Sequence, residues 1–176
     1  WLLDAGVRTV LDIGANIGEY SGIFAELFPD AHIYAFEPLP ECFERLQIVA
    51  ETYGRVTAFK TGLGSEEGSL EFHRSSWLPA SSFREMTDLH RTNFPHSADS
   101  ESIEIPVTTL DKVLTARDLE DNILIKMDVQ GYEDEVIKGG LDIIAKAKIL
   151  IVECSLQTTY ENEPMFHGIY GLPTGL

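Results

Sequence analysis

The segment from Asp12 to Gly18, Asp-Ile-Gly-Ala-Asn-Ile-Gly, combines an acid, two glycines and an asparagine between an apolar run and an amphipathic stretch. Gly14 permits a tight turn and Gly18 permits close approach of a ligand, because glycine lacks a Cβ. The free backbone N–H groups at the start of the following helix suit an anion or a carboxylate. The segment therefore predicts a ligand-binding turn. The structural alternative is a helix start with Asn16 as N-cap and Glu19 completing a capping box.

The spacing within this turn excludes two common nucleotide-binding motifs. A dinucleotide fingerprint requires glycines at positions 14, 16 and 19, where the chain has Gly, Asn and Glu. A phosphate-binding P-loop requires Gly-Lys-Ser/Thr, which does not follow. Glu37 ends the next apolar run, just before Pro38, and its carboxylate can accept hydrogen bonds from both hydroxyls of a ribose. The turn and this acid together predict a nucleoside-type cofactor, although Glu37 alone also fits a solvated loop carboxylate.

Two further acids, Asp128 and Glu153, each end an apolar run in the second half of the chain. Asp128 precedes Gly131, which permits a sharp turn, and we expect its carboxylate to face the space beside the cofactor. Glu153 is expected to contact the substrate or bind a metal ion. The alternatives are that Asp128 braces a loop or caps a helix, and that Glu153 pairs with Lys126. A lysine within a buried run requires a carboxylate partner or a route to solvent.

The remaining polar candidates favour structural roles. Asp111 is expected to be the N-cap of the short helix that it precedes. Glu133 falls in a first helical turn, where the helix dipole favours an acid. The five histidines show no zinc-type spacing, and only His73 is expected near the active face.

Short apolar, β-branched runs alternate with helical stretches along the chain. This alternation predicts an α/β fold with a mostly parallel sheet and helices on both faces. Right-handed crossovers make a Rossmann-like open sheet the leading topology, and such sheets bind ligands outside the carboxyl ends of their strands. The acids described above stand at those ends. The predicted strands of this sheet are residues 7–13, 32–36, 55–60, 122–127 and 148–153. Residues 70–72 and 103–107 are predicted to form two further short strands that pair with each other.

The helical stretches have apolar faces at three- and four-residue spacing. A first helix is predicted over residues 18–28 and a second over residues 40–53, followed by Gly54 as a stop. Residues 109–114 start a short helix, and residues 132–147 are helical with an interruption at Gly139-Gly140. The predicted apolar face of the first helix consists of Ile17, Tyr20, Ile23, Phe24 and Leu27.

Composition limits the classes of function. The 176 residues include 29 acidic and 13 basic residues, and a net charge of −16 argues against a nucleic-acid partner. A hydrophobic fraction of 44% indicates one globular domain, and no apolar run approaches the roughly 18 residues of a membrane span. Cys42 and Cys154 are too few for a disulfide scaffold, which favours reduced thiols and predicts a cytoplasmic protein.

Five stretches of the chain together resemble the FkbM-type S-adenosylmethionine-dependent methyltransferases. The most specific are the Asp-Ile-Gly-Ala-Asn turn with Phe-Glu-Pro, and the Lys-Met-Asp-Val-Gln-Gly run. The resemblance covers nearly the whole chain and implies a class I methyltransferase fold in a single domain, residues 1–176. The stretches are LDIGANIGEYSGIFA (11–25), AFEPLPECFERL (35–46), TLDKVL (109–114), IKMDVQGYEDEVIKGG (125–140) and ILIVEC (149–154).

The resemblance implies methylation of a hydroxyl on a sugar or a polyketide-type metabolite. A sugar hydroxyl gains from a general base, for which Asp128 is the first candidate and Glu153 the second. A divalent ion held by both acids is the open alternative. Gln130 replaces a Glu that many relatives carry, so position 130 receives no catalytic role. The cofactor, S-adenosylmethionine, is expected along Asp12, Gly14, Ala15, Asn16 and Gly18, with Glu37 and Pro38 at the ribose.

A second class of function stays open: a methyltransferase-like domain that binds a nucleoside or a protein without turnover. The intact turn and Glu37 argue against it. Residues 75–102, polar and serine-rich, are predicted to form a mobile lid over the acceptor site. Within it, Trp77, Phe83 and Phe94 would pack on a sugar face, and Ser81 and Ser82 would bond the cofactor or the acceptor. The alternative is an ordinary solvated insertion pinned by its aromatic side chains.

The end of the chain departs from the family pattern. Residues 156–176, rich in Pro and Gly, predict one broken helix and a tail. A class I methyltransferase sheet usually carries a further strand pair there, which we expect to be missing from this chain. An open strand edge is a pairing hazard, so further residues or a second chain are expected to cover it, and an oligomer is possible.

Overall fold

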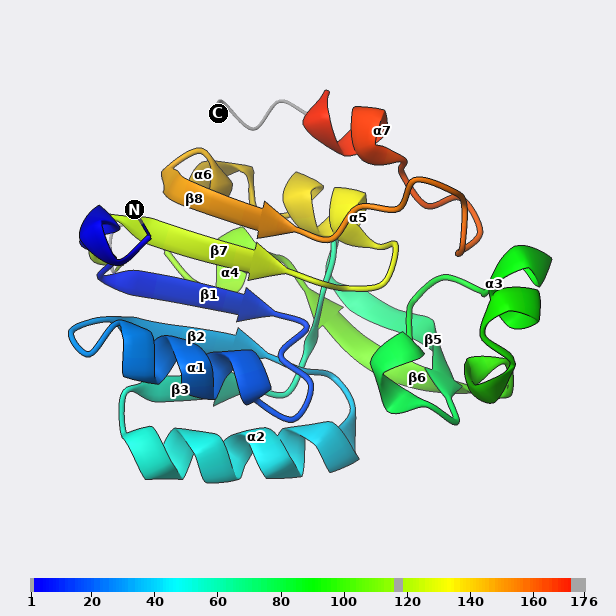
Figure 1. Cartoon of the computed structure of the whole chain (residues 1–176), viewed down its shortest axis with the longest axis horizontal. Helices are drawn as coiled ribbons and strands as arrows, with labels where there is room; N and C mark the ends of the chain where they lie inside the picture. Colours follow the sequence, from blue (N-terminus) through cyan, green and yellow to red (C-terminus); the bar gives the residue numbers. More distant parts are fainter. Residues whose placement is uncertain (1, 116–118, 172–176) are drawn as a thin grey trace.

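The computed structural model describes residues 2–115 and 119–171. Within them, five parallel strands form one sheet in the order β3-β2-β1-β7-β8 (Figure 1). The predicted Rossmann-like architecture is confirmed. The strand order reverses between β1 and β7, and open parallel sheets bind their ligands beside such a reversal. The strands are β1 (Thr9–Ile13), β2 (His32–Phe36), β3 (Val56–Phe59), β7 (Ile123–Met127) and β8 (Ala147–Val152).

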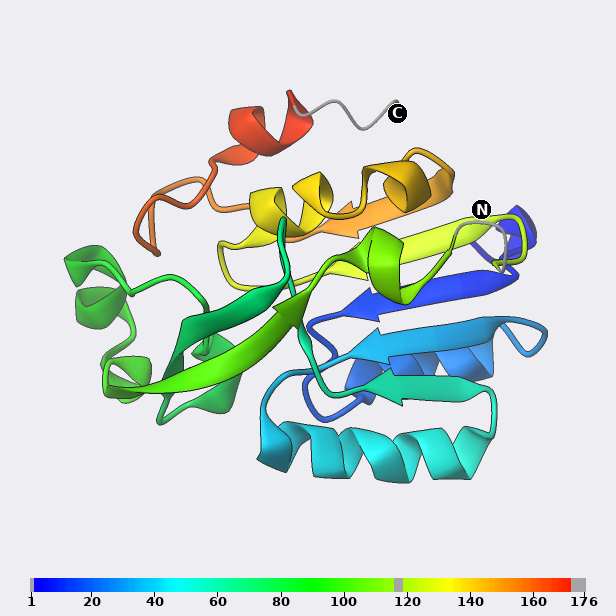
Figure 2. The same cartoon turned by 180° about the vertical axis from the view of Figure 1, so that it is seen from behind.

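Helices cover both faces of this sheet (Figures 1 and 2). Side chains alternate along a strand, so Val10 and Leu124 pack toward α1 (Glu19–Leu27) and α2 (Pro40–Tyr53). Their neighbours Leu11 and Ile125 pack in a second core on the opposite face. The two cores hold the sheet rigidly between them. The helices of the second face are α4 (Leu110–Val113), α5 (Glu133–Lys138) and α6 (Leu141–Ile144), and a 3₁₀ turn, η1 (Leu3–Ala5), precedes β1.

Helix α1 turns a different face to the sheet from the one that its sequence pattern predicts. Tyr20, Ile23 and Leu27 are 50%, 42% and 41% exposed, whereas Ser21 is fully buried. The Ser21 hydroxyl donates a 2.6 Å hydrogen bond to the buried carboxylate of Asp12. A buried carboxylate without a donor costs more than partial exposure of an aliphatic side chain, and this bond explains the rotation of the helix.

A second, smaller sheet lies at the carboxyl-end side of the main sheet (Figure 1). Its strands β5 and β6 pair in antiparallel fashion, and β4 runs parallel to β6. The predicted pairing of residues 70–72 with 103–107 is confirmed, with longer strands. The intervening segment is built of short helices. The elements are β4 (Gly62–Leu63), β5 (Gly68–Ser75), η2 (Leu78–Ala80), α3 (Asp88–Asn93), η3 (Pro95–Ser97) and β6 (Ser100–Thr108).

Asp111 caps a helix other than the predicted one. The N-cap of α4 is Thr109, which makes no side-chain cap bond. The Asp111 carboxylate instead accepts from the backbone N–H groups of Asp142 and Ile143, both at 3.1 Å, at the start of α6. These N–H groups have no partner within their own helix, so a carboxylate from a neighbouring helix satisfies them. The contact fixes α4 against α6.

The chain after β8 crosses back toward the smaller sheet. In the described residues 153–171 it forms α7 (Phe166–Tyr170) and no strand, apart from an isolated bridge between Met86 and Tyr160. The last part of the predicted tail, residues 172–176, lies outside the described residues. Among the described helices, none has the length and apolarity needed to cross a membrane.

Candidate active site

A cavity of about 420 Å³ opens at the carboxyl ends of β1, β2 and β7. Its size falls in the range of small-molecule sites. The insertion contributes part of the wall, through Trp77, Ser81 and Phe83. The predicted residues that line it are Gly14, Ala15, Asn16, Glu37, Pro38, Asp128 and Ser81.

The turn after β1 owes its shape to residues with positive φ. Gly14 has φ 75°, and a Cβ there would lie 1.9 Å from the backbone oxygen of Asp128. Gly18 has φ 86° and is the N-cap of α1, where a Cβ would lie 2.9 Å from Leu46 Cδ1. Gly18 therefore permits close packing of α1 on α2, and it lies outside the lining of the cavity. The capping-box alternative with Asn16 as N-cap is wrong.

Glu37 is held at the edge of the cavity by two backbone donors. Its Oε2 accepts from the N–H of Asn16 at 2.9 Å, and its Oε1 accepts from the N–H of Leu39 at 2.8 Å. The residue is only 6% exposed. Burial raises its pKa to about 7, against the lowering effect of the two backbone hydrogen bonds. Each carboxylate oxygen has a further lone pair, so the group can still accept hydrogen bonds from a ligand.

Asp12 lies beneath the cavity and braces it. The residue is fully buried and outside the lining. Its register partner across the β1–β7 pair is Lys126, whose Nζ lies 3.4 Å from Asp12 and 3.5 Å from Asp128. The same Nζ donates to the backbone oxygen of Gly14 at 3.0 Å. In the described part of the chain, Lys126 therefore pairs with these two aspartates, and the alternative pairing with Glu153 is wrong. Burial raises the pKa of Asp12, opposed by the charge of Lys126.

Asp128 and Glu153 are joined by the side-chain amide of Gln130. Its Nε2 donates to Asp128 Oδ1 at 2.8 Å and to Glu153 Oε2 at 2.7 Å. Its Oε1 accepts from the hydroxyl of Tyr160 at 2.9 Å, which fixes the orientation of the amide. Sequence analysis assigned no catalytic role to position 130. The role depends on Tyr160, which is 30 residues away in sequence, so no local sequence pattern could predict this contact.

The two acids of this pair differ in charge. Burial and the neighbouring charge of Asp128 raise the pKa of Glu153 to about 8. Burial also acts to raise the pKa of Asp128, but the hydrogen bond from Glu153 and the charge of Lys126 outweigh it, so this pKa is lowered. These opposite shifts favour a proton on Glu153 and the negative charge on Asp128. Of the two, Asp128 is the group able to accept a proton.

Glu133 is a site residue that the sequence reading missed. It is 3% exposed, and its Oε1 accepts from the N–H of Val129 at 3.0 Å and of Gly131 at 3.3 Å. Burial raises its pKa to about 7. Glu133 does fall in the first turn of α5, as predicted, but its side chain also turns back and holds the loop between β7 and α5. An acid four residues after Val129 and two after Gly131 is the only sequence signal for this role.

The two serines of the insertion have different positions. Ser81 lines the cavity, and its Oγ accepts from the N–H of Ser75 at 3.0 Å. Ser82 is 1% exposed and lies outside the lining; its Oγ donates to the backbone oxygen of Gln130 at 2.7 Å. Ser82 therefore ties the insertion to the loop that carries Asp128. His73 pairs with Ser82 through the backbone and also lies outside the lining.

The donor set around Asp128 and Glu153 does not fit a metal ion. The amide N–H group of Gln130 points at both carboxyl groups, in the place that a bridging cation would occupy. Among residues 2–115 and 119–171, no three His, Cys, Asp or Glu side chains gather in a way that would bind a metal. We therefore derive no step through a metal ion.

Comparison with known proteins identifies the family. The family model described as the methyltransferase FkbM domain matches residues 12–172, nearly the whole chain. The chain belongs to the FkbM methyltransferase family. Its turn after β1, its Glu37 and its Asp128 all fall within the matched range, so this FkbM domain carries the complete cavity.

Three curated relatives that this FkbM domain resembles are named methyltransferases. 2-O-methyltransferase NoeI of Sinorhizobium fredii is 29% identical over 97% of this chain and 73% of its own length. Hexuronic acid methyltransferase AglP of Haloferax volcanii is 29% identical over 81% of this chain and 54% of its own length. Methyltransferase sdnD of Sordaria araneosa is 31% identical over 74% of this chain and 59% of its own length. The chain thus spans between about half and three quarters of these relatives.

Proposed function

We propose that the chain is an S-adenosylmethionine-dependent O-methyltransferase that acts on a hydroxyl of a sugar or of another small metabolite. The observation that carries the proposal is Glu37, a buried carboxylate held by two backbone donors at the wall of the cavity. The names of NoeI and AglP support an oxygen acceptor on a carbohydrate. We infer one methyltransferase domain over residues 1–176.

The residues of the cavity fit this cofactor. Glu37 would accept the ribose hydroxyls, and Pro38 lies beside it in the same wall. The glycine turn leaves room next to Gly14, Ala15 and Asn16 for the amino-acid part of the cofactor. Asp12 and Gly18 support the turn from behind rather than touching the ligand. The bound cofactor would supply an electrophilic methyl group.

The protein's own contribution is to orient the acceptor hydroxyl and to remove its proton. An acceptor held beside the methyl group reacts when its oxygen lies in line with the bond that breaks. Asp128 lines the cavity and is ionised, so we assign it the role of general base. Glu153 keeps its proton, and with Gln130 it fixes the orientation of the Asp128 carboxylate.

The test is cofactor binding by wild type and by two Glu37 variants, measured by calorimetry. Glu37→Ala should bind S-adenosylmethionine about ten- to a hundredfold more weakly, because charged hydrogen bonds of about 1.5–3 kcal/mol are lost. Glu37→Gln keeps one acceptor oxygen and should lose less affinity for the cofactor than Glu37→Ala does. Glu51→Ala, an exposed acid on α2, is the matched control. Unchanged affinity in a folded Glu37→Ala protein would contradict the assignment.

A methyl-transfer assay separates the enzyme from a domain that binds without turnover. Labelled S-adenosylmethionine is incubated with the protein and with metabolite extracts that contain glycosides and hydroxylated natural products. The expected result is label in an alkali-stable methyl ether. Tight cofactor binding together with no transfer in any extract would favour the binding-domain alternative.

A further inference from the structure

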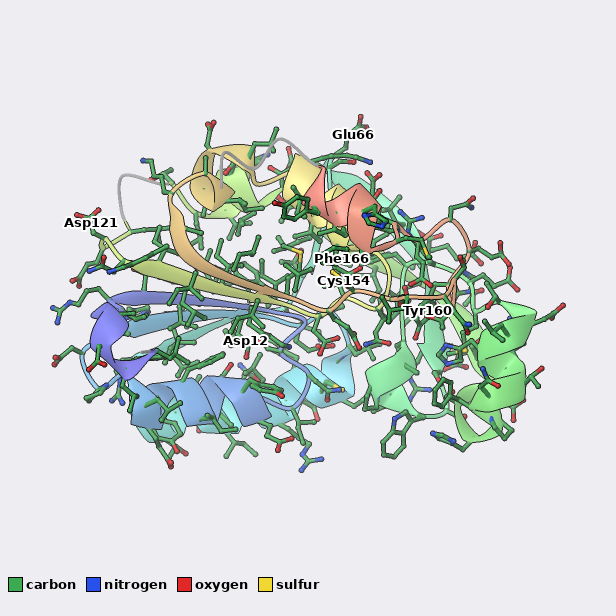
Figure 3. The ribbon with its side chains drawn as sticks, turned by 45° about the horizontal axis from the view of Figure 1, so that its top comes forward. Asp12, Glu66, Asp121, Cys154, Tyr160 and Phe166 are labelled. Atoms are coloured by element: carbon green, nitrogen blue, oxygen red, sulfur yellow. The ribbon has the colours of Figure 1, made fainter. Side chains whose placement is uncertain are left out.

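A second cavity, of about 610 Å³, adjoins the first one. The two share three lining residues, Trp77, Pro79 and Gln130. The second cavity lies between the insertion and the segment that follows β8. Figure 3 shows Cys154 and Tyr160, which line it, at the opposite end of the sheet from Asp121. A ligand in this cavity would therefore reach Asp128 and the first cavity across the shared wall.

The ionisable side chains that line this second cavity are three glutamates, two histidines, His90 and His96, and Cys154 and Tyr160. The glutamates are Glu133, Glu153 and Glu163, and among the described residues the lining includes no Lys or Arg. The two arginines of the adjacent insertion lie outside the lining, where Arg84 is paired with Asp134 at 2.7 Å and Arg91 with Glu85 at 3.1 Å. The surroundings of the cavity therefore offer an anion no ready partner.

The rest of the lining suits an uncharged, hydroxylated ring. Trp77 and Phe94 are 54% and 46% exposed, so their rings are available to a ligand. His90 is only 6% exposed, and in the described part of the chain its Nδ1 has no hydrogen-bond partner. Its Nε2 is already paired with Ser97 Oγ at 3.1 Å. Burial lowers the pKa of His90, so the imidazole is neutral and supplies no positive charge.

We propose that the second cavity is the acceptor site, and that it selects acceptors that are neutral or cationic and rejects those that carry a carboxylate or a phosphate. This inference rests on the proposed methyltransferase function and adds the charge class of the substrate. An anion in this cavity would lose its hydration beside acidic side chains, with the ionised Asp128 behind the shared wall and no Lys or Arg in the described lining to pair with it, so the lining disfavours an anion. The inference separates this chain from AglP, whose name specifies a hexuronic acid.

The test uses three probes that differ only at carbon 6 of one sugar. They are methyl β-D-glucopyranoside, its 6-amino-6-deoxy analogue and methyl β-D-glucopyranosiduronate. Affinities are measured by ligand-observed NMR on the full chain, with and without S-adenosylmethionine. The neutral and amino glycosides should bind, and the uronate should bind at least tenfold more weakly. Equal or tighter binding of the uronate, or binding of none of the probes, overturns the inference.

Variants locate the effect in the second cavity. Glu163→Gln keeps an acceptor oxygen for the N–H groups of Thr159 and Tyr160, removes an acid from the lining, and should narrow the difference in affinity between the glucoside and the uronate. Trp77→Ala should weaken binding of both sugars, whereas Tyr170→Ala, an exposed aromatic residue outside both linings, should not. Unchanged discrimination in Glu163→Gln together with unchanged affinity in Trp77→Ala would also overturn the inference.

Cofactor calorimetry keeps the two hypotheses apart. If the protein binds S-adenosylmethionine but prefers the uronate, the result supports the proposed function and contradicts the inference about acceptor charge. If the protein discriminates among the sugars but neither binds the cofactor nor transfers a methyl group, the result supports the sugar site and contradicts the proposed function.

Discussion

Asp128 and Glu153 follow neighbouring strands, yet the structure gives them different charges. A single amide, from Gln130, contacts both, and Lys126 lies 3.5 Å from Asp128. Two carboxyl groups that share a site cannot both ionise easily, so the one nearer the cation takes the charge. The cation is itself held by Asp12 in the sheet below. The register of β1 and β7 therefore decides which of the two acids can act as base.

Asp128→Asn should lower the rate of methyl transfer by about 10²–10⁴-fold, the usual contribution of a general base. The Kd for S-adenosylmethionine should change little, because the isosteric amide fills the same volume. Turnover of the wild type should be insensitive to a chelator, since Gln130 occupies the place of a bridging ion. Normal turnover in the variant would return Asp128 to a loop-bracing role, and loss of activity with chelator would restore the metal alternative.

At the scale of elements, the insertion between β5 and β6 provides walls for both cavities. Trp77 and Pro79 line both, and Ser81 and Phe83 line the first. Its helical elements are short, and the 3₁₀ turn η2 is closed by the hydrogen bond from the N–H of Ala80 to the backbone oxygen of Trp77 at 2.9 Å. Segments with short elements and exposed turns open more readily than a packed sheet. The insertion is therefore the part of the site best able to admit ligands.

We expect the insertion to act as a lid. Saturation with S-adenosylmethionine should slow amide hydrogen exchange within residues 76–99 and reduce their cleavage by protease. Adding a bound glycoside should slow exchange further. The amides of β1 and β7 serve as internal controls, since the two cores already protect them. Unchanged exchange in the insertion with both ligands saturating, or full activity after shortening it, would leave it as an ordinary solvated segment.

Local patterns predicted the main sheet and the pairing of β5 with β6, because strands are recognised from the alternation of side chains along the chain. They also predicted the helix interruption at Gly139-Gly140 and the turn after β1, because these features depend on residues close in sequence. The predictions failed where one distant polar contact overrides a pattern. Helix α1 rotates so that Ser21 reaches Asp12, and Asp111 caps α6 rather than its own helix. Gln130 and Glu133 could not be assigned because their partners are fixed only by the folded chain.

At the scale of the whole molecule, burial raises the pKa of several carboxyl groups in a chain whose net charge is strongly negative. The chain carries a net charge of −16, and Glu37, Glu133 and Glu153 are carboxyl groups whose pKa values are raised to about 7, 7 and 8. Each binds its proton more tightly in the folded chain than in the unfolded chain. Between about pH 4.5 and pH 8 the folded state therefore holds more protons, and rising pH lowers the free energy of unfolding.

The melting temperature should consequently be higher at pH 5.5 than at pH 8. Each kcal/mol lost corresponds to roughly 2–4 °C in a domain of this size. Glu133→Gln keeps an acceptor for the N–H of Val129 but removes a titrating group. The fall in melting temperature from pH 5.5 to pH 8 should therefore be smaller in this variant than in the wild type. Glu66→Gln, on the exposed surface (Figure 3), should follow the wild type. A melting temperature that rises over this interval would refute the assignment.

Gly14 joins the two halves of the site more closely than hydrogen bonds alone would. A Cβ at this position would collide with the backbone oxygen of Asp128, so the turn after β1 and the loop that carries Asp128 are in direct backbone contact. Neither can shift without displacing the other. The insertion and the segment after β8 line the cavities without taking part in this contact. An engineer could therefore reshape the second cavity through those two segments while the spacing between the turn and Asp128 stays as it is.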